Sequence, residues 1–113
     1  HLVSFERDLD PLRLAARHAA YFPHLRHAAP QALLRAGRWA RAEGGVVWTL
    51  HAGDFLEQLD APAAPDLVFY DPFSAKTDAP LWTADVFARL RARCAGRVAE
   101  LYTYSAATAV RVA

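Results

Sequence analysis

Short apolar segments alternate along this chain with longer segments of helical periodicity. Apolar, β-branched and aromatic residues predict strands over residues 2–5, 46–51, 67–70 and 98–104. The third of these segments is a continuous run of apolar and aromatic side chains, and we therefore expect that strand to be fully buried.

Helix-boundary residues stand between these predicted strands. Asp10 and Pro11 mark the start of the first helix, and Thr83 marks the start of a later helix that ends near Gly96. The other predicted helices cover residues 30–36, residues 55–59 and the chain from residue 106 onward.

The alternation of strands and helices predicts an α/β fold. A helix between successive strands makes those strands parallel, so we expect a doubly wound, mostly parallel sheet. No repeat or linker marks a boundary, and residues 1–113 are interpreted as part of a single domain. The sequence has no methionine and enters an apolar stretch almost at once, which we interpret as an excerpt from a longer protein.

Composition narrows the possible classes of protein. The chain has 113 residues, 54% of them hydrophobic, and its net charge of +1 lacks the basic excess typical of nucleic-acid binders. No apolar run could span a membrane, and the single cysteine, Cys94, excludes an internal disulfide; both observations fit a cytoplasmic protein. The five histidines lack metal-ligand spacing, so we expect no metal site. Arginines 35, 38 and 41 and arginines 89, 91 and 93 are interpreted as solvated helical faces.

Each predicted strand ends on, or is followed by, residues suited to binding. These residues are Glu6, Gly53 with Asp54, Asp71, and residues 103–105. In a parallel sheet such strand ends share one edge, where α/β proteins bind ligands. A carboxylate there can accept both hydrogen bonds of a ribose diol, Gly53 allows a flat base to approach, and Asp71 can hold an amine. The alternatives are structural: Glu6 as a solvated strand end, Asp54 as a helix N-cap and Asp71 as a turn former.

The segment that begins at Asp71 is the most informative part of the sequence. Asp71 ends a predicted strand, and Pro72 and Phe73 form a turn directly beyond it. Lys76, the only lysine of the chain, follows in the same turn, and Trp82 could line a pocket beside it.

Taken together, these residues resemble the MnmC-like group of S-adenosylmethionine-dependent methyltransferases. The resemblance covers essentially all 113 residues, and the order and spacing of its motifs make it specific. The motifs are Ser4-Phe5-Glu6, Gly53-Asp54, Asp71-Pro72-Phe73-Ser74, Leu81-Trp82-Thr83 and Thr103-Tyr104-Ser105-Ala106 with Val110-Arg111.

The resemblance implies roles for the acids and for Gly53. Glu6 resembles the acid that binds the ribose hydroxyls of S-adenosylmethionine, and Asp54, next to Gly53, resembles the acid that contacts the adenine amine. Asp71 matches the catalytic aspartate close to the methionine part of the cofactor and to the methyl acceptor.

The remaining roles concern the turn and its surroundings. The resemblance implies that Pro72 and Phe73 help to bind the cofactor. Lys76, Trp82 and Tyr104 are candidate residues of the substrate pocket.

Family membership would make tRNA the partner, because this group adds the last methyl to the 5-methylaminomethyl group of a wobble uridine. It also implies a Rossmann-like methyltransferase fold, of which this excerpt runs from the second strand through the helix after the fifth. The first strand with its Gly-rich loop and the last strands would then lie outside the excerpt. Residues 75–80, Ala-Lys-Thr-Asp-Ala-Pro, depart from the family's usual turn of proline, a basic residue and Asn-Pro.

Four alternatives remain open at this point. The domain could methylate a small-molecule or other amine, or could be a methyltransferase-like binding module without catalysis. A nicotinamide-dependent oxidoreductase also places an acid after its second strand. A signalling receiver with Asp71 as phosphoacceptor would need a lysine after the last strand, where this chain has Thr103 and Tyr104.

Overall fold

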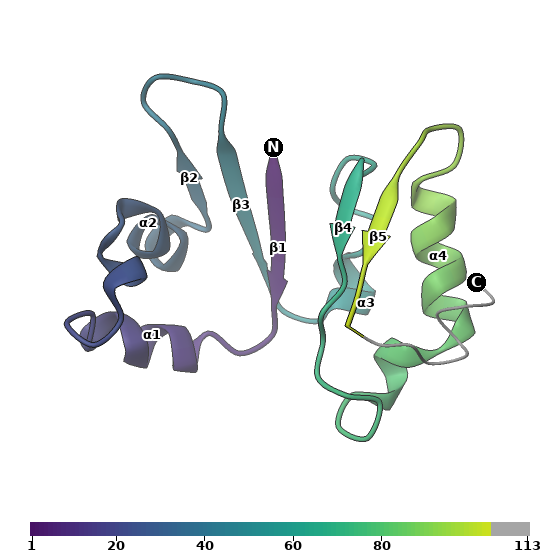
Figure 1. Cartoon of the computed structure of the whole chain (residues 1–113), viewed down its shortest axis with the longest axis horizontal. Coiled ribbons are helices and arrows are strands. Elements are labelled where there is room, and N and C mark those ends of the chain that lie inside the picture. Colours follow the sequence, from purple (N-terminus) through teal and green to yellow (C-terminus); the bar gives the residue numbers. More distant parts are fainter. Residues whose placement is uncertain (105–113) are drawn as a thin grey trace. The chain divides into compact units, whose positions relative to one another are not determined.

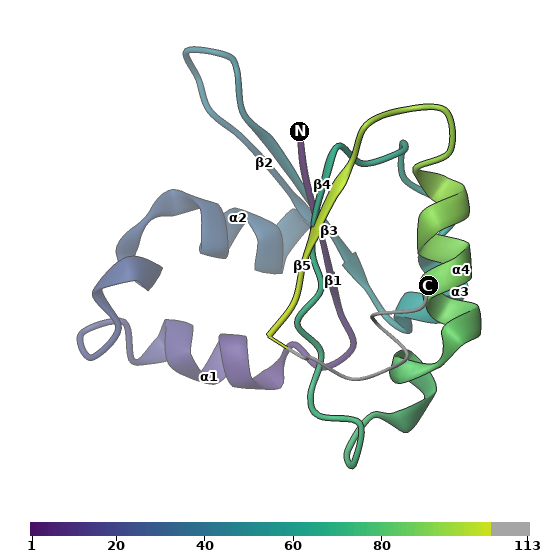
Figure 2. The same cartoon turned by 45° about the vertical axis from the view of Figure 1, so that its right-hand side comes forward.

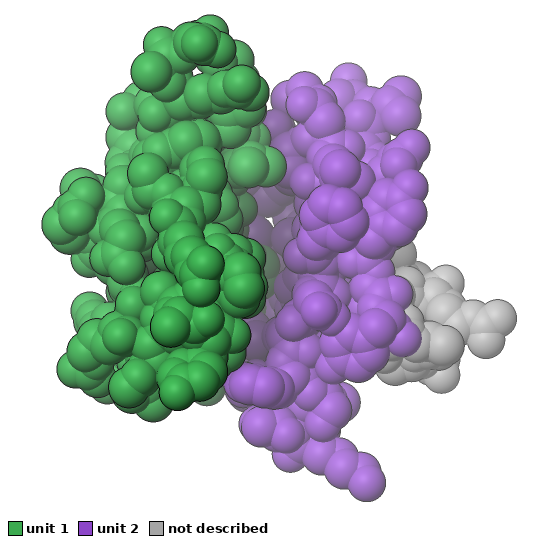
Figure 3. All heavy atoms as spheres, turned by 60° about the vertical axis from the view of Figure 1, so that its left-hand side comes forward, with its two compact units in different colours: residues 1–58 green, residues 59–113 purple. Residues whose placement is uncertain are grey.

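The computed structural model of the protein describes residues 1–104, in two compact units (Figure 3). Unit 1 covers residues 1–58, and unit 2 is described over residues 59–104. The helix predicted from residue 106 onward, and Ser105 before it, lie outside the described residues.

Unit 1 holds a three-stranded sheet with helices against it (Figures 1 and 2). Its elements are β1 (Leu2–Glu6), α1 (Asp10–Arg17), the 3₁₀ helix η1 (Pro23–Arg26), α2 (Ala28–Ala36), β2 (Arg38–Ala40), β3 (Val47–Ala52) and α3 (Phe55–Gln58). The predicted strands and helices of this half of the chain are therefore confirmed, with shifted ends.

The sheet of unit 1 has the strand order β1-β3-β2. β1 and β3 are parallel, as predicted, in a register that pairs Leu2 with Trp48 and Glu6 with Ala52. β2 is a strand that the sequence did not indicate, and it runs antiparallel to β3 with Trp39 opposite Trp48. The interpretation of residue 38 as part of a helical face was wrong, since pairing of the two tryptophans draws this Ala- and Arg-rich segment into a hairpin.

Side chains and a glycine set the ends of α2. The His27 imidazole accepts a hydrogen bond from the backbone N–H of Ala29 at 3.1 Å, which caps the N-terminus two residues before the predicted start. Gly37 ends the helix with a φ of 64°, and its N–H donates to the Leu33 carbonyl at 2.8 Å. Ala29 and Leu33 are buried with Leu25 in the core of this unit.

Unit 2 combines a two-stranded sheet with one long helix (Figure 1). Its elements are β4 (Leu67–Phe69), the 3₁₀ helix η2 (Ala79–Trp82), α4 (Ala84–Arg93) and β5 (Glu100–Tyr102). β4 and β5 are parallel, and the Thr83 hydroxyl caps α4 by accepting from the Val86 N–H at 3.4 Å. The core of the unit consists of Leu59, Tyr70, Trp82, Val86, Phe87 and Leu90.

β4 is not fully buried, which corrects the prediction for residues 67–70. Tyr70 is buried and packs its ring at 5.3 Å from Phe87 of α4, whereas Leu67 and Phe69 are 48% and 75% exposed. Side chains alternate between the two faces of a strand, so Leu67 and Phe69 lie on the face opposite Tyr70. Phe69 pairs there with Tyr102 of β5, with ring centroids 5.7 Å apart.

Three arginines, two in α4 and one in the segment after it, anchor the loop before β4. Arg89 pairs with Asp60 at 3.1 Å, Arg93 donates to the Pro62 carbonyl, and Arg97 pairs with Asp66. The interpretation of arginines 89 and 93 as a solvated helical face was therefore wrong. Their contacts tie α4 to the loop that leads into β4.

The observed architecture is α/β, and it contains two small sheets. Within the described residues β1 and β4 each have a single strand neighbour, so each forms an edge of its own sheet. Both strand pairs that carry candidate site residues are parallel, as predicted. One continuous, doubly wound sheet is not confirmed.

Replacing Leu33 with alanine should destabilise unit 1 far more than the same replacement at Leu14. Leu33 is 5% exposed and Leu14 is 51% exposed, and both lie in helices. We expect a loss of about 2–5 kcal/mol for Leu33→Ala and under about 1 kcal/mol for Leu14→Ala in urea unfolding. Equal losses would contradict the assignment of Leu33 to the core.

Candidate functional site

In unit 1 the ends of β1 and β3 bring Glu6 beside Gly53. The parallel register aligns Glu6 with Ala52, and the Gly53 N–H donates to the Glu6 carbonyl at 3.0 Å. The Glu6 side chain is exposed, and its Oε1 accepts from the Asp8 N–H at 3.0 Å. The backbone around Glu6 is thus held on both sides, while the carboxylate remains accessible to a ligand.

Gly53 occupies a position that other residues rarely adopt. Its φ is 129°, and a Cβ built there would lie 2.5 Å from Nε2 of Gln58. The Gln58 amide donates to the Ala52 carbonyl at 3.1 Å and so covers the turn. Sequence reasoning missed Gln58, although its position four residues after Asp54, one helical turn on, could have indicated it.

Asp54 acts as a helix N-cap. This is one of the two interpretations of Asp54 that the sequence left open, the other being contact with the adenine amine. Its Oδ1 accepts from the Leu56 N–H at 2.7 Å, at the start of α3. The side chain is half-buried. This cap uses one oxygen of the carboxylate, Oδ1. It therefore does not prevent the carboxylate from also accepting a hydrogen bond from a ligand.

Aromatic contacts support this edge of unit 1. Phe5 stacks on His51 at 5.3 Å and meets Phe55 edge-on at 5.0 Å, and the Trp48 indole N–H donates to the Ser4 hydroxyl at 2.8 Å. These contacts join β1, β3 and α3 directly behind the strand ends. Glu6, Gly53 and Asp54 therefore form one cluster on a supported backbone.

In unit 2 the end of β4 presents Asp71. The Tyr70 N–H donates to the Tyr102 carbonyl at 2.8 Å, which extends the parallel ladder to the residue before Asp71. Asp71 itself is exposed, and Phe73 is 73% exposed. The predicted site residues of this segment are thus accessible to a ligand.

Lys76 lies in the turn that follows. The Ser74 carbonyl accepts from the N–H groups of Thr77 and Asp78 at 2.8 and 2.9 Å, which folds the chain back after Phe73. Lys76 is exposed within this turn.

Trp82 and Tyr104 both reach the backbone beyond Asp71. The indole N–H of Trp82 donates to the Phe73 carbonyl at 2.6 Å, and the Tyr104 hydroxyl donates to the Pro72 carbonyl at 2.8 Å. Trp82 is buried, whereas Tyr104 is 62% exposed. The predicted set Asp71, Pro72, Phe73, Trp82 and Tyr104 therefore forms a second cluster, within unit 2.

Tyr70 supports this second cluster from inside the core. Its hydroxyl donates to the Leu81 carbonyl at 2.5 Å. Burial, and secondarily the negative charge of Asp78, raise the pKa of Tyr70 to about 12. The hydroxyl therefore remains a hydrogen-bond donor throughout the physiological pH range.

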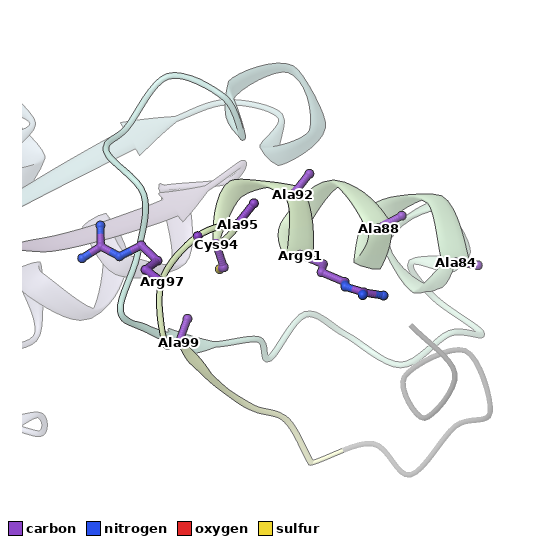
Figure 4. A pocket seen from close by; sticks show the side chains of 9 residues that line it. Ala84, Ala88, Arg91, Ala92, Cys94, Ala95, Arg97 and Ala99 are labelled. Carbon is purple, nitrogen blue, oxygen red and sulfur yellow. The ribbon is translucent and has the colours of Figure 1, made fainter.

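A surface hollow of about 790 Å³ lies elsewhere in unit 2 (Figure 4). It is lined by residues of α4 and of the segment that follows, mostly alanines, and includes none of the site residues predicted from the sequence. The small alanine side chains on the surface of α4 leave this depression. Because it contains none of the predicted site residues, the hollow is not the candidate site.

Within residues 1–104 there is neither a metal-type cluster nor a membrane-spanning helix. In this range no three histidine, cysteine or acidic side chains gather as a metal site would require. The helices in the same range are also too short or too polar to cross a membrane.

Comparison with known proteins assigns the chain to a family. Residues 17–113 match the model of a family described as S-adenosyl-L-methionine-dependent methyltransferase. The chain belongs to this methyltransferase family. Membership implies a Rossmann-like fold and S-adenosylmethionine as cofactor. No solved structure matches the chain.

Two curated relatives confirm that this methyltransferase is MnmC-like. The tRNA 5-methylaminomethyl-2-thiouridine biosynthesis bifunctional protein MnmC of Burkholderia vietnamiensis is 40% identical, over 100% of this chain and 19% of its own length. Its counterpart in Burkholderia multivorans is 36% identical, over 98% of this chain and 18% of its own length. The methyltransferase chain thus spans about a fifth of the length of these relatives.

Gly53→Ala should strain the turn after β3. We expect a loss of about 1–3 kcal/mol in the free energy of unfolding, because an alanine is strained at a φ of 129° and its Cβ would move the Gln58 amide off the Ala52 carbonyl. Gly45→Ala is the control, since its φ is also positive, 85°, but its Cβ would have no neighbour within 4 Å. Adding Gln58→Ala should recover part of the loss at Gly53. Equal losses at Gly53 and Gly45 would show that the close contact has no effect.

Proposed function

We propose that this methyltransferase transfers a methyl group from S-adenosylmethionine to the nitrogen of an aminomethyl group on the wobble uridine of tRNA. The observation that carries the proposal is the position of Glu6, Gly53–Asp54 and Asp71 at the carboxyl ends of parallel strands, in a chain of the MnmC-like kind. A tRNA substrate also favours a cytoplasmic location.

We further propose that residues 1–113 are part of one doubly wound methyltransferase domain. The pairing of β1 with β3 and of β4 with β5 supports this, because both pairs are parallel, as the strands of such a sheet are.

The cluster in unit 1 has the chemistry to bind the adenosine part of the cofactor. Glu6 presents an exposed carboxylate that can accept both hydrogen bonds of a ribose diol. Asp54 can accept from the exocyclic amine of adenine, while the Gln58 amide fills the space beside Gly53 and supports the turn that carries Asp54. The residues present therefore fit the cofactor that the family implies.

Asp71 is the candidate catalytic residue. The bound cofactor supplies an activated methyl on a sulfonium, so the protein mainly has to position the acceptor, and good orientation can contribute roughly 7–11 kcal/mol. Asp71 would accept a hydrogen bond from the amine, orient its lone pair and take its proton directly or through water. Its negative charge would also stabilise the positive charge that develops on nitrogen. Pro72 and Phe73 would border the same pocket, with Lys76 toward the substrate.

Replacing Asp71 should affect methyl transfer, whereas replacing Glu6 should affect binding of the cofactor. Asp71→Asn should lower kcat by about 100-fold or more and leave the Kd of the cofactor within about threefold. Glu6→Gln should instead raise that Kd about 10- to 100-fold, because hydrogen bonds to the charged carboxylate are lost. Stopped-flow or quenched turnover gives kcat, and calorimetry gives the Kd. Asp85→Asn, an exposed aspartate of α4 with no assigned role, is the matched control.

The outcome that contradicts this division is equal loss of turnover and affinity in both variants. Asp71 would then serve cofactor binding alone.

The identity of the methyl acceptor can be tested with S-adenosylmethionine that carries a labelled methyl group. The protein that carries this chain should move a labelled methyl from S-adenosylmethionine to tRNA that lacks only the final wobble methyl, and fully methylated tRNA should accept none. Label on a small amine but not on tRNA would favour the alternative acceptor. Cofactor binding without transfer to any amine would favour a binding module.

A further inference from the structure

Two aromatic side chains hold the backbone that carries Asp71. Tyr104 donates its hydroxyl to the Pro72 carbonyl at 2.8 Å, and Trp82 donates its indole N–H to the Phe73 carbonyl at 2.6 Å. These carbonyls belong to the two residues directly after Asp71. The donors come from segments on either side of α4 in the sequence, so two separate segments of the chain hold the turn.

Packing fixes the Trp82 donor, and the Trp82 ring in turn contacts the exposed ring of Tyr104. Trp82 is 7% exposed, and its ring meets Tyr70 at 5.6 Å and Tyr104 at 5.8 Å, both edge-on. Tyr70 is fixed at its backbone by Tyr102 and at its hydroxyl by the Leu81 carbonyl. The residue before Asp71 and the two residues after it are therefore all held by hydrogen bonds.

The chemistry of these groups makes the arrangement specific. An indole N–H can only donate, and the carbonyls of Pro72 and Phe73 lie beyond the last paired residues of β4. Asp71 is exposed, so its carboxylate has no burial to orient it and depends on the backbone on which it stands. A pocket wall would need only the rings of Trp82 and Tyr104, whereas the structure uses their polar atoms.

We propose that Trp82 and Tyr104 are positioning residues that set the place of the Asp71 carboxylate through the backbone of Pro72 and Phe73. The proposal rests on the proposed catalytic function of Asp71. It assigns these aromatic residues an effect on kcat through their N–H and O–H groups.

Tyr104→Phe keeps the ring and removes the hydroxyl. In the protein that carries this chain we expect kcat for methyl transfer to tRNA to fall about tenfold, because the carboxylate is displaced. The Kd of the cofactor and the melting temperature should change little, since the side chain is largely exposed. Trp82→Phe should lower kcat in the same direction, with a lower melting temperature because a buried ring is made smaller.

Tyr102→Phe is the matched control. Its hydroxyl donates to Glu100 at 2.8 Å and has no contact with the turn, although Tyr102 lies only two residues from Tyr104. We expect turnover of this variant to equal that of the wild type.

A double-variant cycle separates positioning from general support. In an Asp71→Asn background Tyr104→Phe should have no further effect on kcat, because there is no carboxylate left to position. A tenfold loss in both backgrounds, or no loss in the wild-type background, would overturn the proposal. Asp71→Asn without any effect on turnover would instead refute the proposed catalytic role of Asp71, and no methyl transfer to tRNA in the wild type would refute the proposed function, so these failures are distinguishable.

Discussion

Parallel strand pairing determines where the candidate site residues of this chain lie. In each unit the hydrogen-bond ladder extends one residue beyond the assigned strands, from Gly53 to the Glu6 carbonyl and from Tyr70 to the Tyr102 carbonyl. Because parallel strands end at the same edge, these bonds bring polar residues far apart in sequence to neighbouring positions. If either register shifted by one residue, every side chain of the strand would change face and the clusters would be lost.

Several polar side chains at these edges combine a structural task with a proposed chemical one. Asp54 caps α3 through one carboxylate oxygen, and Glu6 holds the loop toward α1 while it remains exposed. In unit 2 the structural and the proposed chemical tasks belong to different residues. Asp71 is exposed, while Trp82 and Tyr104 hold the backbone beside it. In the role proposed for Asp71, its carboxylate would thus be positioned by neighbours that hold the backbone of Pro72 and Phe73.

The sequence predicted those parts of the fold that local pattern determines. Residues 46–51 and 67–70 have the β-branched and aromatic content of strands, and Thr83 stands at a helix start, so their elements could be located. β2 could not be predicted, because its Arg-Trp-Ala sequence becomes a strand only by pairing with β3. Burial of β4 was overestimated, since it depends on which faces other elements cover. The residues of both clusters were identified from strand ends, whereas Gln58 and the hydrogen bonds of Trp82 and Tyr104 depend on tertiary packing.

The cluster of Glu6, Gly53 and Asp54 at the strand ends of unit 1 is proposed to bind the adenosine part of the cofactor. A crystal structure of the protein that carries this chain, with S-adenosylhomocysteine bound, would test this role most directly. We expect the ribose hydroxyls to bind Glu6 and the adenine amine to meet Asp54 beside Gly53. Adenosine bound away from Glu6 and Asp54 would contradict the role proposed for this cluster.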